Sequence, residues 1–258
     1  MADDKSLRDV VHVPAAEKVL HVLAAFELRP RWLLRELAAQ VGIPKSSVHR
    51  LLASLRSMQF VQQDPRDGSY HLGPQIWRLA SRSRDFDTLA DVARPVLQML
   101  VGETRESAFL TVQDGLHSLC IARASAPHGV RLLIDLGTAS PLHLGASNSI
   151  LLAFLPEVER SMILSQTVLQ PAERVTAEAE MRRIADAGYA FSSSQLTPGA
   201  AAIGVPVFDS VGRIAAALSI GAPAFRFDMA RALEVLPLLR RAAGSIAQRI
   251  GHTHSAPA

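Results

Sequence analysis

The chain has 258 residues, of which 48% are hydrophobic, and its 27 lysines and arginines exceed its 24 aspartates and glutamates by three. This composition suffices for one large globular domain or two ordinary ones. No apolar run reaches the roughly 18 residues of a membrane-spanning helix, and the first residues are acidic, unlike an export signal. We therefore expect a cytoplasmic protein with no membrane partner. The single cysteine, Cys120, excludes an internal disulfide and an all-cysteine metal site.

The positive charge is concentrated in the first third of the chain. Between residues 29 and 84, ten basic side chains stand against three acidic ones. Such a local field attracts a polyanion, for example a nucleic acid. A solvated basic surface without a partner would have the same composition, so charge alone leaves both interpretations open.

Three short helices and a hairpin are predicted in the first 73 residues. Apolar residues recur at helical spacing over residues 14–28, 32–42 and 44–58, with Gly42 ending the second helix and Pro44 in the first turn of the third. The stretch FVQQDPRDGSYHLG, residues 60–73, has strand character on either side of a Pro-Arg-Asp-Gly turn. This pattern is typical of a hairpin.

The third helix has a small polar face opposite its apolar stripe. At 100° per residue its leucines cluster with Val48, and short side chains on the other face would let the helix enter the major groove of DNA. The outward residues are Ser46, Arg50, Ala53 and Ser57. Ala38, Gly42 and Val48 have the spacing of a helix-turn-helix. With the hairpin, this spacing predicts a winged helix-turn-helix, and a plain helical bundle is the alternative.

The predicted DNA contacts follow from reach and charge. Lys45 and Arg50 can neutralise phosphates or touch guanine, and Arg66 lies at the tip of the hairpin. The two serines and His49 can hydrogen-bond the DNA backbone or base edges, although a packing or capping role stays open for His49. The predicted DNA-binding residues are Lys45, Ser46, Ser47, His49, Arg50 and Arg66.

The rest of the chain predicts a linker helix and an α+β domain around an antiparallel sheet, because hairpins and helices occur without strict alternation. Strands are expected over residues 107–124 as a pair, over 130–137, and over 201–221 as a hairpin that turns at 209–212. Helices are expected over residues 146–156, over 176–190 with Thr176 as the cap, and over 228–250. We place a DNA-binding domain at 10–73, a linker helix at 74–90 and a second domain at 91–252.

The chain resembles the IclR family of bacterial transcriptional regulators. The resemblance begins with PKSSVHRLLASL and FVQQDPRDGSYHLG and continues through PLHLGASNSILLAFLP and LTPGAAAIGVPVFDSVGRIAAALSIGAP. It implies a winged DNA-binding domain, a linker helix and an effector-binding domain of GAF/PAS-like fold. It also implies a dimer or a dimer of dimers that binds a pseudo-palindromic operator in double-stranded DNA and senses a small metabolite.

The resemblance also implies an effector pocket, where this chain departs from the family pattern. Members often have a Gly-Lys pair where this chain has Asn148 and Ser149. In members that bind small 2-oxo acids, an acidic residue, a cysteine and two serines are typical at the positions of Ser192, Ala202, Ser219 and Gly221. Because Ala202 and Gly221 lack a donor and enlarge the cavity, we expect a larger, partly apolar effector such as an aromatic acid. The expected pocket residues are Cys120, His143, Leu144, Gly145, Ala146, Asn148, Ser149, Ser192, Ala202, Ile203, Ser219 and Gly221.

The alternatives are an enzyme and an architectural DNA-binding protein that needs no ligand. The sequence has no nucleophile elbow, phosphate loop, dinucleotide fingerprint or His-x-x-x-His spacing, so we expect no catalytic residue, metal or cofactor. His252 and His254 supply only two metal ligands, and Cys120 lies in an apolar strand, as inert thiols do. A second domain that is neither repetitive nor basic argues against an architectural protein.

Overall fold

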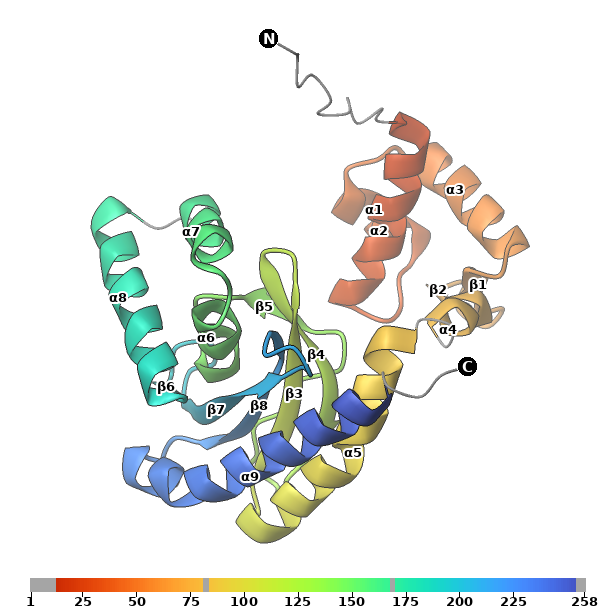
Figure 1. Cartoon of the computed structure of the whole chain (residues 1–258). Helices are drawn as coiled ribbons and strands as arrows, with labels where there is room; N and C mark the ends of the chain where they lie inside the picture. The colour runs from red at the N-terminus through yellow and green to blue at the C-terminus, as the bar shows by residue number, and fades with distance from the viewer. Residues whose placement is uncertain (1–12, 81–83, 168–169, 254–258) are drawn as a thin grey trace. The chain divides into compact units, whose positions relative to one another are not determined.

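The structure is a computed structural model that describes residues 13–80, 84–167 and 170–253. Contacts divide the chain into two compact units with the boundary between residues 83 and 84, and each unit is described by itself (Figure 1). The domain limits at 10–73, 74–90 and 91–252 stay predictions. Within the described residues, no helix is both long and apolar enough to cross a membrane.

The first unit has the helices and the hairpin expected from the sequence, followed by one further helix. Its two-stranded sheet is antiparallel, with Val61 opposite Leu72. Its elements are α1 (Pro14–Leu28), α2 (Leu34–Val41), α3 (Lys45–Ser57), β1 (Val61–Gln63), β2 (Tyr70–Leu72) and α4 (Pro74–Ala80).

The crossing of α2 and α3 confirms the predicted helix-turn-helix. Gly42 caps α2 with φ +66° and donates its N–H to the carbonyl of Ala38. Glycine adopts this left-handed conformation without the steric cost of a Cβ. Val48 and Leu52 of α3 are fully buried against the core of the unit. Burying one such aliphatic side chain contributes about 1.5–3 kcal/mol, so the stripe fixes which face of α3 stays outside.

The start of the second helix differs from the prediction. Trp32, expected inside the helix, forms an isolated antiparallel bridge with Tyr70 of β2, and its indole N–H donates to the carbonyl of Ala25. The tryptophan is buried, so both of its polar backbone groups and its ring N–H need partners. Tyr70 of the hairpin supplies partners for the two backbone groups and α1 supplies one for the ring N–H, so Trp32 ties the hairpin to the helical core.

The second unit is a six-stranded antiparallel sheet in the order β5-β4-β3-β8-β7-β6 with helices on both faces. Its strands are β3 (Ser107–Asp114), β4 (His117–Ala124), β5 (Ala139–Pro141), β6 (Ala190–Ser193), β7 (Ala200–Phe208) and β8 (Ile214–Pro223). Its helices are α5 (Arg84–Thr104), α6 (Ala146–Ala153), α7 (Glu157–Gln166), α8 (Pro171–Ala187) and α9 (Met229–Thr253).

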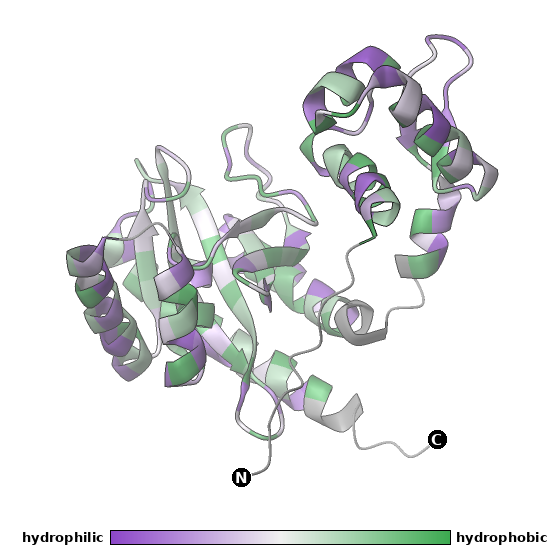
Figure 2. Cartoon of the chain, turned by 90° about the horizontal axis from the view of Figure 1, so that it is seen from above, coloured by the Kyte–Doolittle hydropathy of each residue, from purple (hydrophilic) through white to green (hydrophobic). Residues whose placement is uncertain are grey.

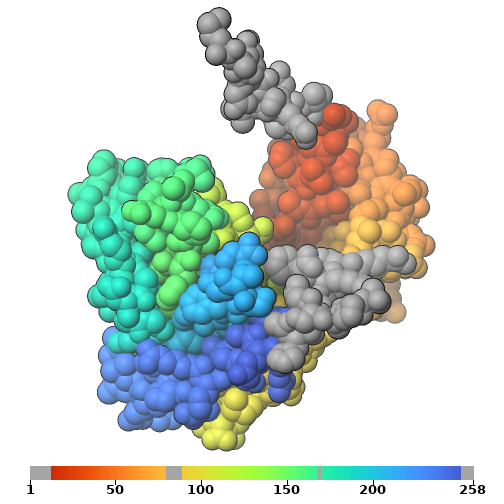
Figure 3. Space-filling model, viewed as in Figure 1, coloured from red at the N-terminus to blue at the C-terminus, as the bar shows by residue number. Residues whose placement is uncertain are grey.

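One face of the sheet, called the back here, is covered by α5 and α9. These two helices contact each other and the sheet, and Figures 1 and 3 show them side by side. Alternate residues of the central strands, such as Leu110, Ile203, Leu218 and Ile220, are fully buried between sheet and helices. Side chains that alternate with these therefore point to the opposite face, called the front.

The front is covered by helices only in part. The apolar helix α6 packs on β7 and β8, and α8 packs on α6. α8 carries many charged residues, and Figure 2 shows its outer side as largely hydrophilic. α6 also contacts β3 and β4, and beside it the irregular loop of residues 125–138 borders the front. The front therefore offers space for a ligand beside α6.

Three predictions for this unit are wrong. Residues 130–137 form no strand, because the carbonyls of Val130 and Ile134 accept hydrogen bonds from arginine side chains. α8 begins five residues before Thr176, and its capping box consists of Gln170 and Glu173. The Thr176 hydroxyl donates to a carbonyl one turn earlier inside the helix. The helix α7 was not expected at all.

Candidate DNA-binding and effector sites

The outward face of α3 presents the residues predicted to contact DNA. Lys45, Ser46, His49 and Arg50 are exposed, and Ser47 is half-buried at the start of the helix. Ala53, one turn after Arg50, is also exposed. At the N-terminal end of this face the serine side chains are short and polar, so the base edges and the backbone of DNA can approach the helix closely.

Two cations on this face carry no internal partner. Within the described part of the chain, the side chains of Lys45 and Arg50 make no hydrogen bond or ion pair, whereas Arg56 donates to Gln63 and Arg29 pairs with Glu36. A charge that is already paired gains little from an additional partner, while an unpaired exposed one is available to a phosphate. Lys45 and Arg50 are therefore the best-placed cations of α3.

The tip of the hairpin is ordered by hydrogen bonds to aspartates. Asp64 accepts the backbone N–H of Arg66, and Arg31 lies 2.9 Å from the same carboxylate. These two interactions, the backbone bond first, lower the pKa of Asp64. The hydroxyl of Ser69 and, after it, the backbone N–H of the same residue lower the pKa of Asp67 by hydrogen bonding to its carboxylate. The Arg66 side chain is exposed at this tip, as the sequence predicts.

The second unit has a cleft on the front of the sheet, bounded by the first turn of α6 and by the loops at 132–138 and 195–197. Its cavity volume is about 60 Å³, room for a few water molecules, so a ring-sized ligand requires the side chains and loops that line the cleft to move apart. Apolar side chains and hydroxyls line it, and no lining side chain is ionised at neutral pH. The lining residues are Phe109, Thr111, Ser118, Cys120, Leu132, Ile134, Thr138, Ser140, Gly145, Ala146, Ser147, Asn148, Ser192, Gln195, Leu196, Thr197, Ala200, Ala201, Ala202 and Ser219.

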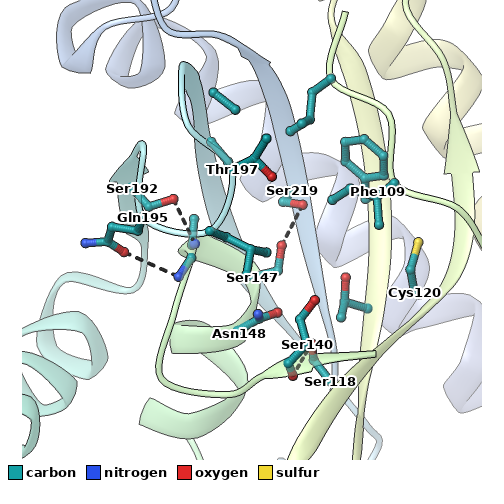
Figure 4. A pocket seen from close by; sticks show the side chains of 18 of the residues that line it. Phe109, Ser118, Cys120, Ser140, Ser147, Asn148, Ser192, Gln195, Thr197 and Ser219 are labelled. Carbon is teal, nitrogen blue, oxygen red and sulfur yellow. Dashed lines mark hydrogen bonds between the residues drawn. The ribbon is translucent and has the colours of Figure 1, made fainter. Parts of the chain in front are cut away.

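Hydroxyl groups hold the start of α6 against the sheet. The Ser147 hydroxyl lies 2.8 Å from the hydroxyl of Ser219 on β8, and Ser192 of β6 accepts the N–H of Ala146 at 3.0 Å. Figure 4 shows these pairs around the cleft, with Phe109 and Cys120 on one side and Gln195 on the other. Gln195 also accepts the Gly145 N–H.

Close packing at one glycine makes this arrangement possible. A Cβ at Gly204 of β7 would lie 3.3 Å from the backbone of Ala146 and Ser147. Side chains larger than hydrogen would move the first turn of α6 away from the sheet. Asn148, one residue further, donates its amide to the carbonyls of Pro141 and Leu144 and so fixes the loop that enters the helix.

The structure brings together seven of the twelve predicted pocket residues. Those that line the cleft are Cys120, Gly145, Ala146, Asn148, Ser192, Ala202 and Ser219. Ile203 points to the back of the sheet, because strand side chains alternate and its neighbour Ala202 points to the front. Leu144 lies in the loop before α6, outside the lining of the cleft. Gly221 is covered, because the Leu132 side chain occupies the space above it.

His143 and Ser149 line a different cavity, between α6, β6 and α8. Nδ1 of His143 is buried there without a hydrogen-bond partner, and burial lowers the pKa of the imidazole. The two residues flank the first turn of α6, so they lie close to the cleft in sequence, but the helix separates them from it.

Sequence reasoning missed the wall formed by β3 and the loop, and on β4 it found only Cys120. Phe109 and Thr111 face the cleft from β3 by simple alternation, which a strand prediction could have used. On β4 the pairing register shifts between Leu110 and Thr111 of the neighbouring strand. This bulge lets Cys120 face the front while Ala122 packs on the back.

Cys120 is a buried thiol. It is 3% exposed, and burial raises its pKa to about 11. A thiol with this pKa is protonated at neutral pH and is a weak nucleophile. Among the described residues, no group of three or more His, Cys, Asp or Glu could hold a metal ion. His254, one of the two C-terminal histidines considered above, lies outside the described residues.

Comparisons with known proteins match both units of the chain. Residues 85–248 match the description "Bacterial transcriptional regulator IclR C-terminal", and residues 15–65 match the IclR helix-turn-helix domain. The HTH-type transcriptional regulator KipR of Bacillus subtilis is 32% identical over 92% of this chain and 96% of its own. BhcR of Paracoccus denitrificans, also an HTH-type transcriptional regulator, is 28% identical over 85% of this chain and 81% of its own.

Solved structures have the same fold. An IclR homolog from Microbacterium hydrocarbonoxydans, complexed with 4-hydroxybenzoate, superposes with a TM-score of 0.80, covering 92% of this chain and 98% of that one at 24% identity. A second structure, from Silicibacter sp. TM1040, gives a TM-score of 0.77 over 92% of this chain and 96% of that one at 26% identity.

Proposed function

The chain belongs to the IclR family and is a DNA-binding transcriptional regulator, and from this premise we propose how it binds its operator and which class of molecule controls it. The first unit contacts double-stranded DNA through α3 and the tip of the hairpin, and the cleft of the second unit binds a partly apolar acid. The lining of that cleft, apolar with hydroxyls and without an ionised side chain, is the observation that carries the second statement.

In the proposed DNA complex, α3 lies in the major groove with its N-terminal end toward the bases. Lys45 and Arg50 contact phosphates or guanine, and Ser46, Ser47 and His49 hydrogen-bond the backbone or base edges. Arg66 contacts the backbone next to the groove. Gel-shift titration of the full chain against its own promoter fragment tests this interface, and binding that is insensitive to salt would contradict it.

We infer that the protein acts as a dimer or a dimer of dimers on a pseudo-palindromic site. α1 buries Val22 and Phe26 in its own unit but leaves Leu20 and Leu28 62% and 67% exposed. Exposed leucines on one helix are a common feature of chain-chain contacts. A two-fold dimer requires a two-fold related operator. Sedimentation that shows a monomer both free and on DNA would refute this state.

The proposed effector is a small aromatic acid held at the start of α6. The first turn of a helix has N–H groups without intrahelical partners, and here Ser192 and Gln195 take those of Ala146 and Gly145. The N–H groups of Ser147 and Asn148 are left to bind a carboxylate, together with the Ser219 hydroxyl, which accepts from Ser147 and keeps its own proton to donate. Phe109, Leu132 and Ile134 offer an apolar surface for a ring. The 4-hydroxybenzoate bound to the Microbacterium homolog has the same combination of acid and ring.

Thermal unfolding of the full chain tests this effector class. A ligand present at 100 times its Kd stabilises the native state by about 2.7 kcal/mol. We expect an upward shift of the unfolding temperature with benzoate or 4-hydroxybenzoate, and none with glyoxylate or pyruvate. The opposite pattern would show that the cleft serves a compact 2-oxo acid.

We propose that the cleft senses its ligand without converting it. The acid recovered after prolonged incubation with the protein should be chemically unchanged, while its addition should alter operator affinity. Turnover of the ligand would favour an enzyme, and operator affinity that no ligand alters would favour an architectural protein.

A further inference from the structure

The loop over the cleft places one leucine directly above a glycine of the central sheet. A Cβ built on Gly221 of β8 would lie only 2.5 Å from Cδ2 of Leu132 and 3.2 Å from Cε2 of Phe109. The absence of a side chain at position 221 is therefore what lets the leucine reach the sheet. Leu132 also lines the cleft, so its side chain forms part of the wall that a ligand meets.

Two arginines hold the loop on either side of this leucine. Arg226 donates to the carbonyl of Val130 at 3.0 Å, and Arg123 donates to the carbonyl of Ile134 at 2.9 Å. Arg123 also pairs with the carboxylate of Asp135. The two clamped carbonyls lie two residues before and two residues after Leu132. The backbone that carries the leucine is thus fixed at both ends, although it belongs to no strand.

Arg226 is itself held in a fixed position by an ion pair. Two nitrogens of the Arg226 guanidinium bind the Glu106 carboxylate, Nε at 2.6 Å and Nη2 at 2.9 Å, and the Glu106 side chain is 9% exposed. A bidentate pair of this kind fixes direction as well as distance. Glu106 directly precedes β3, so the position of the loop is set by the sheet.

We propose that Leu132 determines which ring size the effector cleft accepts, and that Arg123 and Arg226 are positioning residues for it. The inference rests on the proposed function, since it concerns the same cleft. Leu132 fills the space over Gly221 with apolar surface and closes that end of the cleft against a second ring. Replacing Leu132 with alanine removes three carbon atoms and opens the space over Gly221. A two-ring acid can fill this space with its second ring, which a single-ring acid lacks.

Titration calorimetry on the full chain, with benzoate and a naphthoate as probes, tests this role. We expect the native protein to bind benzoate more tightly, and Leu132→Ala to change the ratio of the two dissociation constants by about tenfold in favour of naphthoate, a typical effect of a changed apolar pocket. Leu133→Ala is the matched control, because Leu133 is the next residue of the same loop and is 50% exposed outside the cleft lining. It should leave the ratio unchanged.

Three further variants keep the test decisive. Gly221→Ala should weaken both acids, naphthoate most, because its Cβ displaces Leu132 toward the ligand. Arg123→Ala should move the ratio in the same direction as Leu132→Ala, which a merely stabilising residue would not do. If Leu132→Ala does not fold, Leu132→Val should give a smaller change of the same sign. An unchanged ratio in a folded Leu132 variant overturns the inference while the proposed effector class stands. Failure of the native protein to bind either acid overturns both.

Discussion

The hydroxyls of Ser147 and Ser219 lie 2.8 Å apart although the two residues are 72 positions apart in the chain. This hydrogen bond joins the first turn of α6 to the middle of the central strand β8. Ser219 is buried, whereas Ser147 is half-buried at the wall of the cleft. A ligand that binds at this turn therefore meets a hydroxyl whose direction is fixed by the sheet.

Ser219→Ala should weaken effector binding more than it weakens the fold. Loss of one hydrogen bond costs about 1 kcal/mol, and Ser147 can rebond to water in the open cleft, so the unfolding temperature should change little. The proposed effector should bind about fivefold more weakly, because the Ser219 hydroxyl that donates to its carboxylate is removed. Ser193→Ala, an exposed serine on β6, is the control. Equal affinities of the native and Ser219→Ala proteins would contradict this role.

Arg50→Ala should cost about 1–3 kcal/mol of operator affinity with no loss of structure, because the guanidinium is exposed and unpaired within the described residues. Gel-shift titration measures the affinity, and circular dichroism checks the fold. Arg50→Lys keeps the charge but loses the bidentate geometry, so it separates base contact from phosphate contact. Arg241→Ala, which removes an exposed arginine of α9 in the other unit, is the control. Native affinity of Arg50→Ala would remove Arg50 from the interface.

Gly204→Ala should destabilise the second unit by about 1–3 kcal/mol, as overpacking does. Its Cβ would lie 3.3 Å from backbone atoms at the start of α6, and backbone yields less easily than a side chain. Effector affinity should fall as well, since the first turn of α6 moves. Gly102→Ala is the matched control, because a Cβ there meets nothing within 4 Å and alanine favours the helix. A rise in the unfolding temperature of Gly204→Ala would refute the packing argument.

Because of the Cys120 thiol, the free energy of unfolding should fall as the pH rises from about 9 to about 11. Burial raises the pKa of the thiol from 9.0 to about 11, so the native state keeps a proton that the unfolded chain loses. The stabilisation is complete below the unfolded pKa and is lost through this interval, by about 2–3 kcal/mol. Cys120→Ala should lack this part of the pH dependence of unfolding. In the native protein the thiol should react with a disulfide reagent at pH 8 only after urea is added.

Replacing Arg226 alone should lower the free energy of unfolding more than replacing both Glu106 and Arg226. Arg226→Leu leaves the carboxylate of Glu106 buried without its cation, which costs about 3 kcal/mol. In the double variant Glu106→Leu/Arg226→Leu no charge remains unpaired, so the loss should be smaller than the sum of the single losses. Denaturant unfolding of the four proteins gives the coupling energy. Additive losses would mean that the two side chains do not stabilise each other.

The regular parts of the fold could be predicted because local pattern and burial agree. Val48 and its helical neighbours turn one face inward, and the hairpin of β7 and β8 turns at Asp209–Gly212 as its residues favour. The segment 130–137 looked like a strand because it is apolar, but the partners of its carbonyls are Arg123 and Arg226, which lie elsewhere in the sequence. Long-range side-chain contacts of this kind leave no periodic signal in the segment itself.

The candidate site was predictable to the extent that neighbours in sequence share a face. Ala202 and Ser219 point to the front of the sheet, but Ile203, grouped with Ala202, points to the back. Gly221 was expected to enlarge the cavity, and instead its space holds Leu132. A glycine shows that something approaches closely, and only the fold shows whether that is a ligand or another side chain.

The two helices behind the sheet set an order for folding during synthesis. α5 begins the second unit and α9 comes last among its described elements, yet they cover the same face and contact each other. On the ribosome, the strands between them emerge with their back face open to solvent until the 25 residues of α9 have left the exit tunnel. Contacts between distant segments also fold slowly. The DNA-binding unit can therefore fold while the chain is still growing, whereas the sensor becomes stable only after its last helix is released.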